Sequence, residues 1–160
     1  MPVILDWEEL ATKLEPYRTS GKRIVSTNGV FDVLHIGHAR YLQEARDLGD
    51  LLVVGINSDA CARHLKGPTR PFVSQQERAE LLAALRCVDY VTIFDEPTPE
   101  ALLAVIRPRY HAKGGDYHVE MMPETAIVRH YGGEVIALPF VEGRSTTELT
   151  EKIAKALTMQ

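Results

Sequence analysis

The sequence has 160 residues, a length that suits one domain with a core of its own. Its composition is 45% hydrophobic and 25% charged, with 11 Gly and 9 Pro, which excludes a disordered, collagen-like or coiled-coil chain. The 18 Lys and Arg residues against 22 Asp and Glu residues give a formal net charge of -4, the wrong sign for a protein whose main partner is nucleic acid or an anionic membrane.

The apolar runs and the cysteines predict a cytoplasmic protein. No basic residue precedes an apolar run in residues 1–10, so we expect no secretory signal, and the longest apolar stretch, Leu51–Ile56, is too short to span a bilayer. Cys61 and Cys87 have no metal-ligand spacing and are expected to be reduced thiols. We expect one domain over residues 1–160, whose first 20 residues form a helical extension.

The predicted elements begin with a helix and continue as strands that alternate with helices. Asp6 and Glu9 form a capping box for a helix over residues 6–15, which Pro16 ends or interrupts. Strands are expected over residues 24–27, 51–56, 88–94, 110–113 and 135–138. Further helices are expected over residues 36–48, 74–85, 98–106, 124–131 and 145–157. This alternation predicts an α/β fold, a single Rossmann-like doubly wound parallel sheet of about five strands with helices on both faces.

Sheets of this kind bind ligands beyond the carboxyl ends of their strands, where the strand order reverses. Chemistry is therefore expected in residues 27–38, 57–71, 113–118 and 142–147. No GxGxxG fingerprint, GxxxxGK[ST] P-loop or HExxH motif occurs, so dehydrogenase, P-loop kinase and zinc protease functions lose their main support.

The first of these loops carries two histidines at the start of a helix. It comprises Asn28, Gly29, Val30, Phe31 and Asp32, followed by His35, Gly37 and His38. Imidazoles three residues apart project on nearly the same side, and a helix N-terminus offers free N–H groups to an anion. We therefore expect a triphosphate here; the alternative is that the histidines only cap the helix or lie in the core.

The start of the last helix offers a second anion site. Gly143 and Arg144 precede three hydroxyl residues, Ser145, Thr146 and Thr147. These hydroxyls are either simple N-caps or ligands for the other end of a polyphosphate, and the presence of the first loop favours the second interpretation.

A third group of residues follows the second strand. Lys66, Arg70 and Arg78 surround a Gly/Pro-rich segment and predict a mobile clamp on phosphates, against the alternative of solvated surface charges. Asn57 and Asp59, together with Arg70, are expected to bind the second substrate.

The segment after the fourth strand is Lys113, Gly114, Gly115 and Asp116, followed by Tyr117. Its glycines either form a tight turn or allow the backbone to approach a flat base closely. The remaining histidines lack a partner pattern and are expected to be structural: His64, His111, His118 and His130.

Together these motifs resemble the HxGH nucleotidyltransferase superfamily. They closely resemble the bacterial D-glycero-D-manno-heptose 1-phosphate adenylyltransferases, or ADP-heptose synthases, over residues 22–153. In many bacteria that domain is the C-terminal part of a fusion with a sugar kinase, whereas we expect a stand-alone form here. Small departures from the family pattern occur at Val30 and Ala112.

The resemblance implies that heptose 1-phosphate and ATP give ADP-heptose and pyrophosphate. The sugar phosphate attacks the α-phosphorus in line, so no side-chain nucleophile is required. His35 and His38 would donate to the phosphates, Lys66 would reach the α-phosphate or the sugar phosphate, and Arg78 with residues 145–147 would hold the leaving pyrophosphate.

The resemblance also implies how the nucleotide and its cofactor are held. Gly114, Gly115 and Asp116 would line the base and ribose, and ATP is expected over CTP and GTP. Asp32 is either a contact for a metal or water, or a structural cap. Mg²⁺ held mainly by the ATP phosphates, with no metal site made by the protein, is the implied cofactor.

Two other functions remain open. Glycerol-3-phosphate cytidylyltransferases are similar in the first and last motifs, so transfer of a cytidylyl group to a polyol phosphate is the alternative within the enzyme class. A nucleotide-binding regulator without turnover is the alternative from a different class. The expected partners are ATP and a sugar 1-phosphate, with no nucleic acid and no membrane, and the protein is expected to be a homo-oligomer, a dimer.

Overall fold

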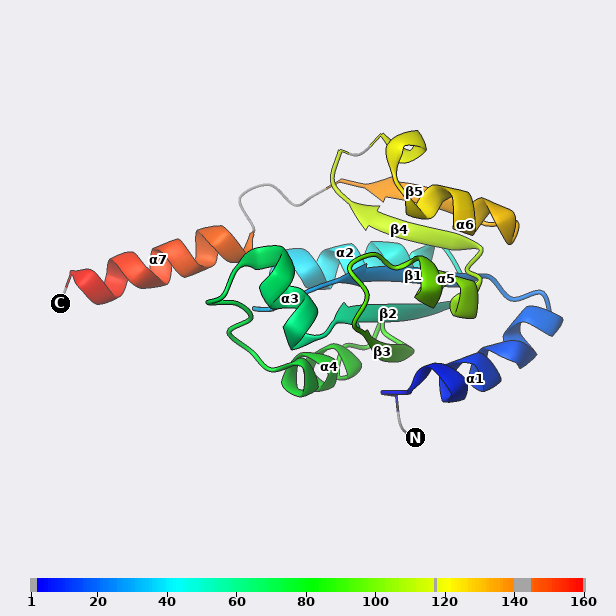
Figure 1. Cartoon of the computed structure of the whole chain (residues 1–160), viewed down its shortest axis with the longest axis horizontal. Coiled ribbons are helices and arrows are strands. Elements are labelled where there is room, and N and C mark those ends of the chain that lie inside the picture. Colours follow the sequence, from blue (N-terminus) through cyan, green and yellow to red (C-terminus); the bar gives the residue numbers. More distant parts are fainter. Residues whose placement is uncertain (1–2, 117, 140–144, 160) are drawn as a thin grey trace.

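The computed structural model describes residues 3–116, 118–139 and 145–159 (Figure 1). Five strands form one parallel sheet in the order β3-β2-β1-β4-β5, as the alternating pattern predicts. The strands are β1 (Ile24–Gly29), β2 (Leu51–Asn57), β3 (Tyr90–Phe94), β4 (Tyr110–Gly114) and β5 (Glu134–Leu138).

Helices cover both faces of the sheet. They are α1 (Trp7–Thr19), α2 (Ile36–Asp47), α3 (Asp59–Lys66), α4 (Gln75–Ala83), α5 (Glu100–Ile106), α6 (Glu124–His130) and α7 (Thr146–Thr158), with a short 3-10 helix η1 (Val119–Met121) before α6. The core on one face joins the sheet to α2 and α4, through residues such as Leu42 and Leu82. The core on the other face joins it to α1 and α5, through residues such as Leu10 and Leu102.

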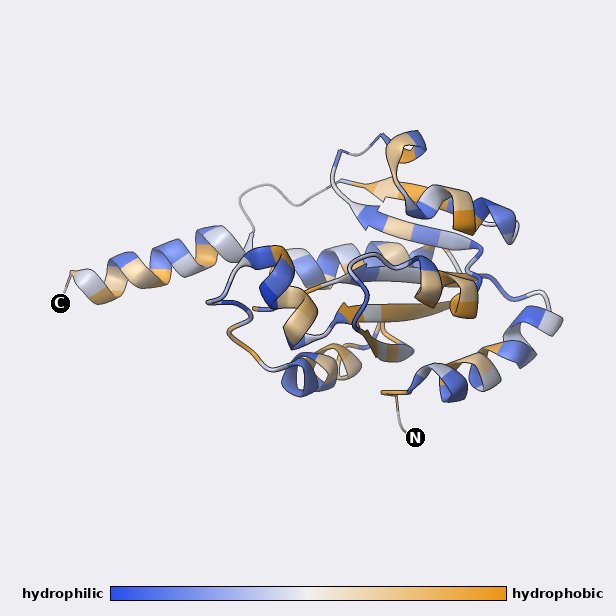
Figure 2. Ribbon diagram, in the orientation of Figure 1, coloured by the Kyte–Doolittle hydropathy of each residue, from blue (hydrophilic) through white to orange (hydrophobic). Residues whose placement is uncertain are grey.

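The central strands are buried on both faces. All seven residues of β2 are buried, and the strand is apolar along most of its length (Figure 2). Successive residues of a strand point to opposite faces, so Val25 of β1 belongs to the core under α2, whereas Ile24 belongs to the core under α1. This two-sided burial explains why β2 reads as a continuous apolar run.

Two helices differ from the sequence-based expectation. α1 does not end at Pro16 but continues to Thr19, because Leu10, Leu14 and Tyr17 all pack on the core and outweigh the one backbone hydrogen bond that proline removes. α3 was not expected at all. It lies within the segment 57–71 and begins where Ser58 Oγ accepts from the N–H group of Cys61 at 3.2 Å.

The N-terminal segment adds backbone pairing at the outer edge of β3. The Leu5 N–H group donates to the Val91 carbonyl at 2.9 Å, and the Val91 N–H group donates to the Val3 carbonyl at 2.8 Å. Ile4 is thereby the parallel partner of Val91.

The last helix, α7, extends away from the rest of the molecule (Figure 1). None of its residues is buried. Across the described ranges, no helix combines the length and apolar character that crossing a membrane requires.

Candidate active site

The carboxyl ends of β1 and β4 mark the place where the chain reverses direction across the sheet. From β1 the chain proceeds to β2 and β3 on one side, and β4 and β5 lie on the other. A crevice at such a switch point is the usual ligand site of doubly wound folds. β1 ends at Gly29 and β4 at Gly114. The two segments that follow these strands, both singled out by their sequence patterns, therefore lie at one place.

His35 and His38 form a stacked pair at the start of α2. Their ring centroids are 3.9 Å apart, with 28° between the ring planes. The Gly37 N–H group donates to His35 Nδ1 at 3.1 Å, and the His35 N–H group donates to His38 Nδ1 at 3.4 Å. Because Nδ1 of each ring accepts from a backbone N–H group, a ring with a single proton carries it on Nε2. Each ring therefore caps the start of the helix through Nδ1.

The environment of His38 keeps its imidazole neutral. Burial lowers the pKa of His38 to about 4, and the nearby charge of His35 acts in the same direction. The Phe31 ring contributes to this burial, with its centroid 5.4 Å from that of His38. At neutral pH, His38 therefore offers a hydrogen-bond donor to an anion and not a full positive charge.

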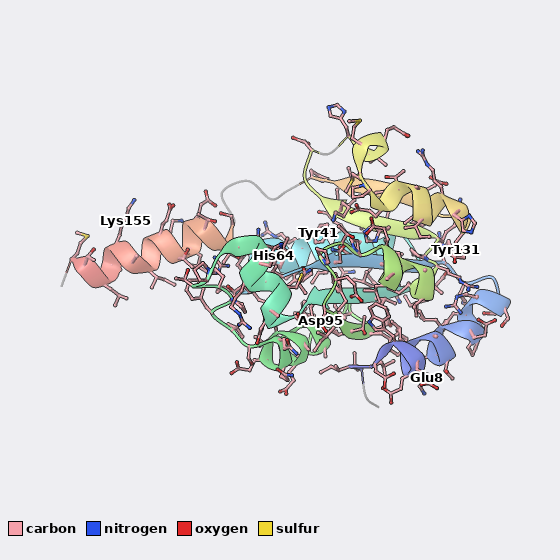
Figure 3. The ribbon with its side chains drawn as sticks, viewed as in Figure 1. Glu8, Tyr41, His64, Asp95, Tyr131 and Lys155 are labelled. Atoms are coloured by element: carbon pink, nitrogen blue, oxygen red, sulfur yellow. The ribbon has the colours of Figure 1, made fainter. Side chains whose placement is uncertain are left out.

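Tyr41, labelled in Figure 3, lies on α2 and connects this helix to both strands of the switch point. Its hydroxyl lies 2.6 Å from Thr27 Oγ1 on β1 and donates to the Ala112 carbonyl on β4 at 2.9 Å. Sequence reasoning missed this residue. Its spacing from His38 could have indicated a place beside the site, because residues three apart lie next to each other on the surface of a helix.

The end of β1 shows two features that suit a ligand. Asn28 Oδ1 is buried and has no hydrogen-bond partner in the described part of the chain. An orphaned buried acceptor is costly, so a donor from a bound molecule would stabilise it. Gly29 allows the close approach of Phe31, because a Cβ atom at Gly29 would lie 3.1 Å from the Phe31 ring.

Asp32 is hydrogen-bonded to the segment after α3, as its structural role would require. The carboxylate accepts from Arg70 Nε at 2.5 Å and from the N–H groups of Phe72 and Val73 at 2.8 and 2.9 Å. Burial alone would raise the pKa of Asp32, but these donors outweigh it and the pKa is lowered. The side chain is 1% exposed, so Asp32 holds the segment after α3 against the histidine loop.

Arg78, which the sequence predicts to hold the pyrophosphate, has a fully buried side chain that is engaged with protein acceptors. Its guanidinium donates to the carbonyls of Val73 at 3.0 Å, Val30 at 2.5 Å and Asn57 at 2.9 Å, and to the Asp59 carboxylate at 2.7 Å. Arg78 thus joins the ends of β1 and β2 to the segment before α4, and it positions these loops from beneath.

The residues expected to bind the second substrate are also engaged within the protein. The Asn57 amide donates to Cys61 Sγ at 3.3 Å, and Asp59 is paired with Arg78. Arg70 is paired with Asp32, and its guanidinium lies over the Phe72 ring. Arg70 is the basic residue of these three, and its side chain is 19% exposed. It therefore has partial access to solvent.

Lys66 is the most accessible cation of the expected phosphate clamp. It is the last residue of α3, it is exposed, and it forms no ion pair within the described residues. Gly67 follows with φ of 102°, a conformation that favours glycine, and turns the chain away from the helix. The ammonium group of Lys66 is therefore free to engage a ligand.

The end of β4 is held by an ion pair to α6. Lys113 Nζ lies 2.9 Å from Glu124 Oε1, and Glu124 is 3% exposed. Gly115 adopts φ of 119°, and its N–H group donates to the Leu138 carbonyl at 2.7 Å. Asp116 is exposed, whereas Tyr117 lies outside the described residues. Sequence reasoning missed Glu124, because its partner is known only once α6 is placed beside β4.

The start of α7 is fastened to the histidine loop. Ser145 Oγ accepts from the Glu148 N–H group at 3.1 Å, and Thr146 Oγ1 donates to the Val33 carbonyl at 3.3 Å. Two helix N-termini, those of α2 and α7, are therefore connected through one loop. Gly143 and Arg144 lie outside the described residues.

Comparison with known proteins identifies the family to which this chain belongs. The model of the cytidylyltransferase-like family matches residues 26–152. The bifunctional protein HldE of Syntrophotalea carbinolica is 55% identical over 146 residues, which cover 91% of this chain and 30% of that protein. HldE of Geobacter sulfurreducens is 53% identical over 147 residues, which cover 92% of this chain and 30% of that protein. The chain thus spans less than a third of the length of these curated relatives.

Solved structures show the same fold. The lipopolysaccharide core biosynthesis protein of Thermoplasma volcanium superposes with a TM-score of 0.64 at 28% identity, covering 78% of this chain and all of that one. Pantothenate synthetase of Thermus thermophilus superposes with a TM-score of 0.59 at 15% identity, covering 88% of this chain and 62% of that one. The second likeness concerns the fold alone.

Proposed function

The chain belongs to the cytidylyltransferase-like family, and on this basis we propose that it joins heptose 1-phosphate to the AMP moiety of ATP and releases pyrophosphate. The similarity to HldE over 91% of the chain supports this choice of substrates, together with the motifs that resemble ADP-heptose synthases. HldE is named as bifunctional, and this chain matches 30% of its length. The proposal therefore concerns one activity.

The observation that carries the proposal is the arrangement of donors at the switch point. Two helix N-termini are connected by the hydrogen bond from Thr146 to Val33, and the stacked histidines lie at one of them. Helix N-termini and neutral imidazole donors suit a polyphosphate, because they stabilise negative charge without a metal site made by the protein. Such a site supports transfer of a phosphate-bearing group.

The proposed step is a direct displacement. A phosphate oxygen of the sugar attacks the α-phosphorus, and the bond from this atom to the bridging oxygen of pyrophosphate breaks. No side chain forms a covalent intermediate. The protein aligns the two substrates and stabilises the charge that develops on the phosphates.

Four residues have distinct parts in this step. His38, together with His35, donates to the phosphates through Nε2. Lys66 neutralises the charge on the α-phosphate or the sugar phosphate, consistent with its exposed position at the end of α3. Arg78 is a positioning residue, because its guanidinium binds the loops that carry the other groups. The hydroxyl residues 145–147 face the departing pyrophosphate.

The base and ribose are assigned to the end of β4 and the residues that follow it. The backbone of Gly114 and Gly115 would contact the base, and Asp116 the ribose. The ion pair between Lys113 and Glu124 supports this assignment, because it fixes the end of β4 on α6. A pocket that hydrogen-bonds one edge of a base leaves groups unpaired against another base, and this favours ATP over CTP and GTP.

Mg²⁺ is the proposed cofactor, carried mainly by the ATP phosphates. Within the residues that the structure describes, no three His, Cys, Asp or Glu side chains are grouped to hold a metal ion. Asp32, the carboxylate nearest in sequence to the histidines, already accepts from Arg70, Phe72 and Val73. An ion bound to the triphosphate would offset phosphate charge.

A substrate matrix tests the proposal. Purified protein is incubated with ATP, CTP or GTP against heptose 1-phosphate, other sugar 1-phosphates and glycerol 3-phosphate, and pyrophosphate release is measured. We expect release with ATP and heptose 1-phosphate, with ADP-heptose as the product. Formation of CDP-glycerol without any ADP-heptose would establish the cytidylyl alternative. Nucleotide binding without pyrophosphate release from any pair would establish a regulator.

A further inference from the structure

The two halves of the sheet are joined by a short ladder. β1 and β4 are neighbours in the strand order β3-β2-β1-β4-β5 (Figure 1). Among the described residues they form two pairs, the second of which joins Ser26 to His111. β1 nevertheless stays paired with β2 as far as Gly29, and β4 stays paired with β5 as far as Gly114. The sheet is therefore continuous within each half, whereas its pairing between β1 and β4 stops before the candidate site.

A tyrosine on α2 forms a link where this ladder ends (Figure 3). In the same register the next pair would be Thr27 with Ala112, and the Tyr41 hydroxyl is hydrogen-bonded to both of these residues. It lies 2.6 Å from Thr27 Oγ1 and donates to the Ala112 carbonyl at 2.9 Å. A phenol has a single proton, which is used on the carbonyl, so the Thr27 hydroxyl is the donor in the other bond. Tyr41 therefore replaces one pair of the ladder with two hydrogen bonds to a side chain.

The hydroxyl of Tyr41 can be removed without loss of the ring. The ring is partly buried and packs against the apolar core under α2. Tyr41→Phe keeps this packing and removes the two hydrogen bonds, because phenylalanine neither donates to Ala112 nor accepts from Thr27. The effect of this variant therefore reports on the link between β1, β4 and α2.

The link connects two parts of the molecule that one nucleotide would contact. Tyr41 lies on α2, the helix that begins beside His35 and His38, and the proposed function assigns these histidines to the phosphates. Ala112 lies on β4, whose end is assigned to the base and ribose. A ligand that spans two subsites binds more tightly when their separation is fixed beforehand, because binding then does not have to order them.

We propose that Tyr41 is a positioning residue that holds the histidine pair of α2 at a fixed separation from the end of β4. Its hydroxyl fastens α2 to both halves of the sheet at the first position beyond the ladder. The inference rests on the proposed function, because it takes the start of α2 as the phosphate site and the end of β4 as the base site. Loss of the hydroxyl should therefore weaken ligands that reach both parts and spare ligands that reach the phosphate site alone.

The test compares the binding of two ligands by titration calorimetry, with Mg²⁺ present in both cases. ATP would reach both parts of the site, whereas inorganic tripolyphosphate offers only the phosphates. For Tyr41→Phe we expect the dissociation constant of ATP to rise at least about 5-fold, since two hydrogen bonds of the link are lost. That of tripolyphosphate should change less than about 2-fold. Retained binding of tripolyphosphate also shows that the variant is folded.

Tyr131→Phe is the matched control. Tyr131 follows α6 and is 37% exposed, and its hydroxyl forms no hydrogen bond within the residues that the structure describes. The chemical change is the same as in Tyr41→Phe, but no link between strands is lost. Both ligands should bind to this variant as they bind to the wild type.

A variant of Thr27 tests whether Tyr41 acts through the hydrogen bonds described. Thr27→Val removes the donor to Tyr41, while the bond from Tyr41 to Ala112 remains. The dissociation constant of ATP should therefore rise by a smaller factor, about 2-fold. The double variant should bind ATP no more weakly than Tyr41→Phe alone, because both changes break the same bond.

Three results would contradict the inference. Equal weakening of ATP and tripolyphosphate by Tyr41→Phe would show that the hydroxyl supports the phosphate site or the fold in general. Unchanged binding of ATP, or independent effects of Thr27→Val and Tyr41→Phe, would show that the link does not position the site. A wild-type chain that binds tripolyphosphate but not ATP would overturn the proposed function together with this inference, and the comparison of variants is not needed to recognise that result.

Discussion

The guanidinium of Arg78 and the carboxylate of Asp59 form an ion pair of 2.7 Å in which the arginine side chain is fully buried and the aspartate side chain is 28% exposed. The pair joins α4 to the start of α3. The same guanidinium also binds the carbonyls of Val30 and Asn57, at the ends of β1 and β2. The loops around the candidate site are therefore held together by one side chain beneath them.

Replacement of this arginine should damage the fold. Arg78→Ala leaves the Asp59 carboxylate and three carbonyls without their donor, and loss of one partner of a buried ion pair costs about 3–5 kcal/mol. We expect this reduction in the free energy of unfolding by urea denaturation, with little change for Arg86→Ala, since Arg86 is exposed. A variant of normal stability with only weaker nucleotide binding would instead support the direct phosphate contact that the sequence predicted.

Removal of the His38 imidazole should affect turnover and not folding. His38→Ala removes a donor aimed at charge that grows in the transition state, and one such donor is worth about 10²- to 10³-fold in kcat. His130→Ala is the control, because this exposed histidine lies at the end of α6. Pyrophosphate release measures the effect. Turnover of His38→Ala near that of the wild type would show that the start of α2 does not bind the reacting phosphates.

Lys66→Ala should weaken the chemical step more than the binding of ATP. An exposed lysine next to Gly67 engages fully only when both substrates are present. We expect kcat to fall by at least about 10-fold with a smaller change in KM, and no effect for Lys22→Ala, an exposed lysine before β1. A raised KM at unchanged kcat would assign Lys66 to binding alone.

The stability of the fold should decrease as the pH falls below 6.5. Burial lowers the pKa of His111 to about 3 and that of His38 to about 4, against 6.5 for an unperturbed histidine. Between these values the unfolded chain binds protons that the folded chain does not bind, so the free energy of unfolding falls by up to about 1.4 kcal/mol per pH unit for each histidine. Above pH 6.5 this contribution is fully present.

Urea unfolding over this pH range measures the slope. His111→Asn removes one of the two buried histidines while an amide remains near Ser26, the partner of His111 Nδ1 at 2.8 Å. The variant should show about half of the slope that the two histidines cause. An unchanged slope in the variant would mean that His111 does not contribute to the acid sensitivity.

Most of the fold follows from local patterns. The capping boxes at Asp6, Ser74 and Ser145 all exist as hydrogen bonds, since each of these side chains accepts from the backbone three residues later. The five strands coincide with apolar or β-branched runs because a central parallel strand is buried on both faces. α3 has only eight residues and lies inside the segment 57–71, where a ligand-binding loop rather than a helix was expected.

The positions of the site segments also followed from sequence, whereas the partners of individual side chains did not. The rule that ligands bind at the carboxyl ends of strands led to the loops after β1 and β4, which lie together. The sequence predicts Arg78 as part of a phosphate clamp and leaves Asp32 open between a contact for a metal or water and a structural cap. Their acceptors and donors come from segments far apart in the chain, so only the folded structure reveals that these charges are satisfied internally.

The N-terminal segment covers part of the open edge of the sheet. An open strand at the edge of a sheet is a template for a strand from another molecule, and this is a route to aggregation. Residues 3–5 occupy both backbone groups of Val91 on the outer side of β3. A strand from another molecule would therefore find these groups of Val91 already paired, which shortens the open edge of β3.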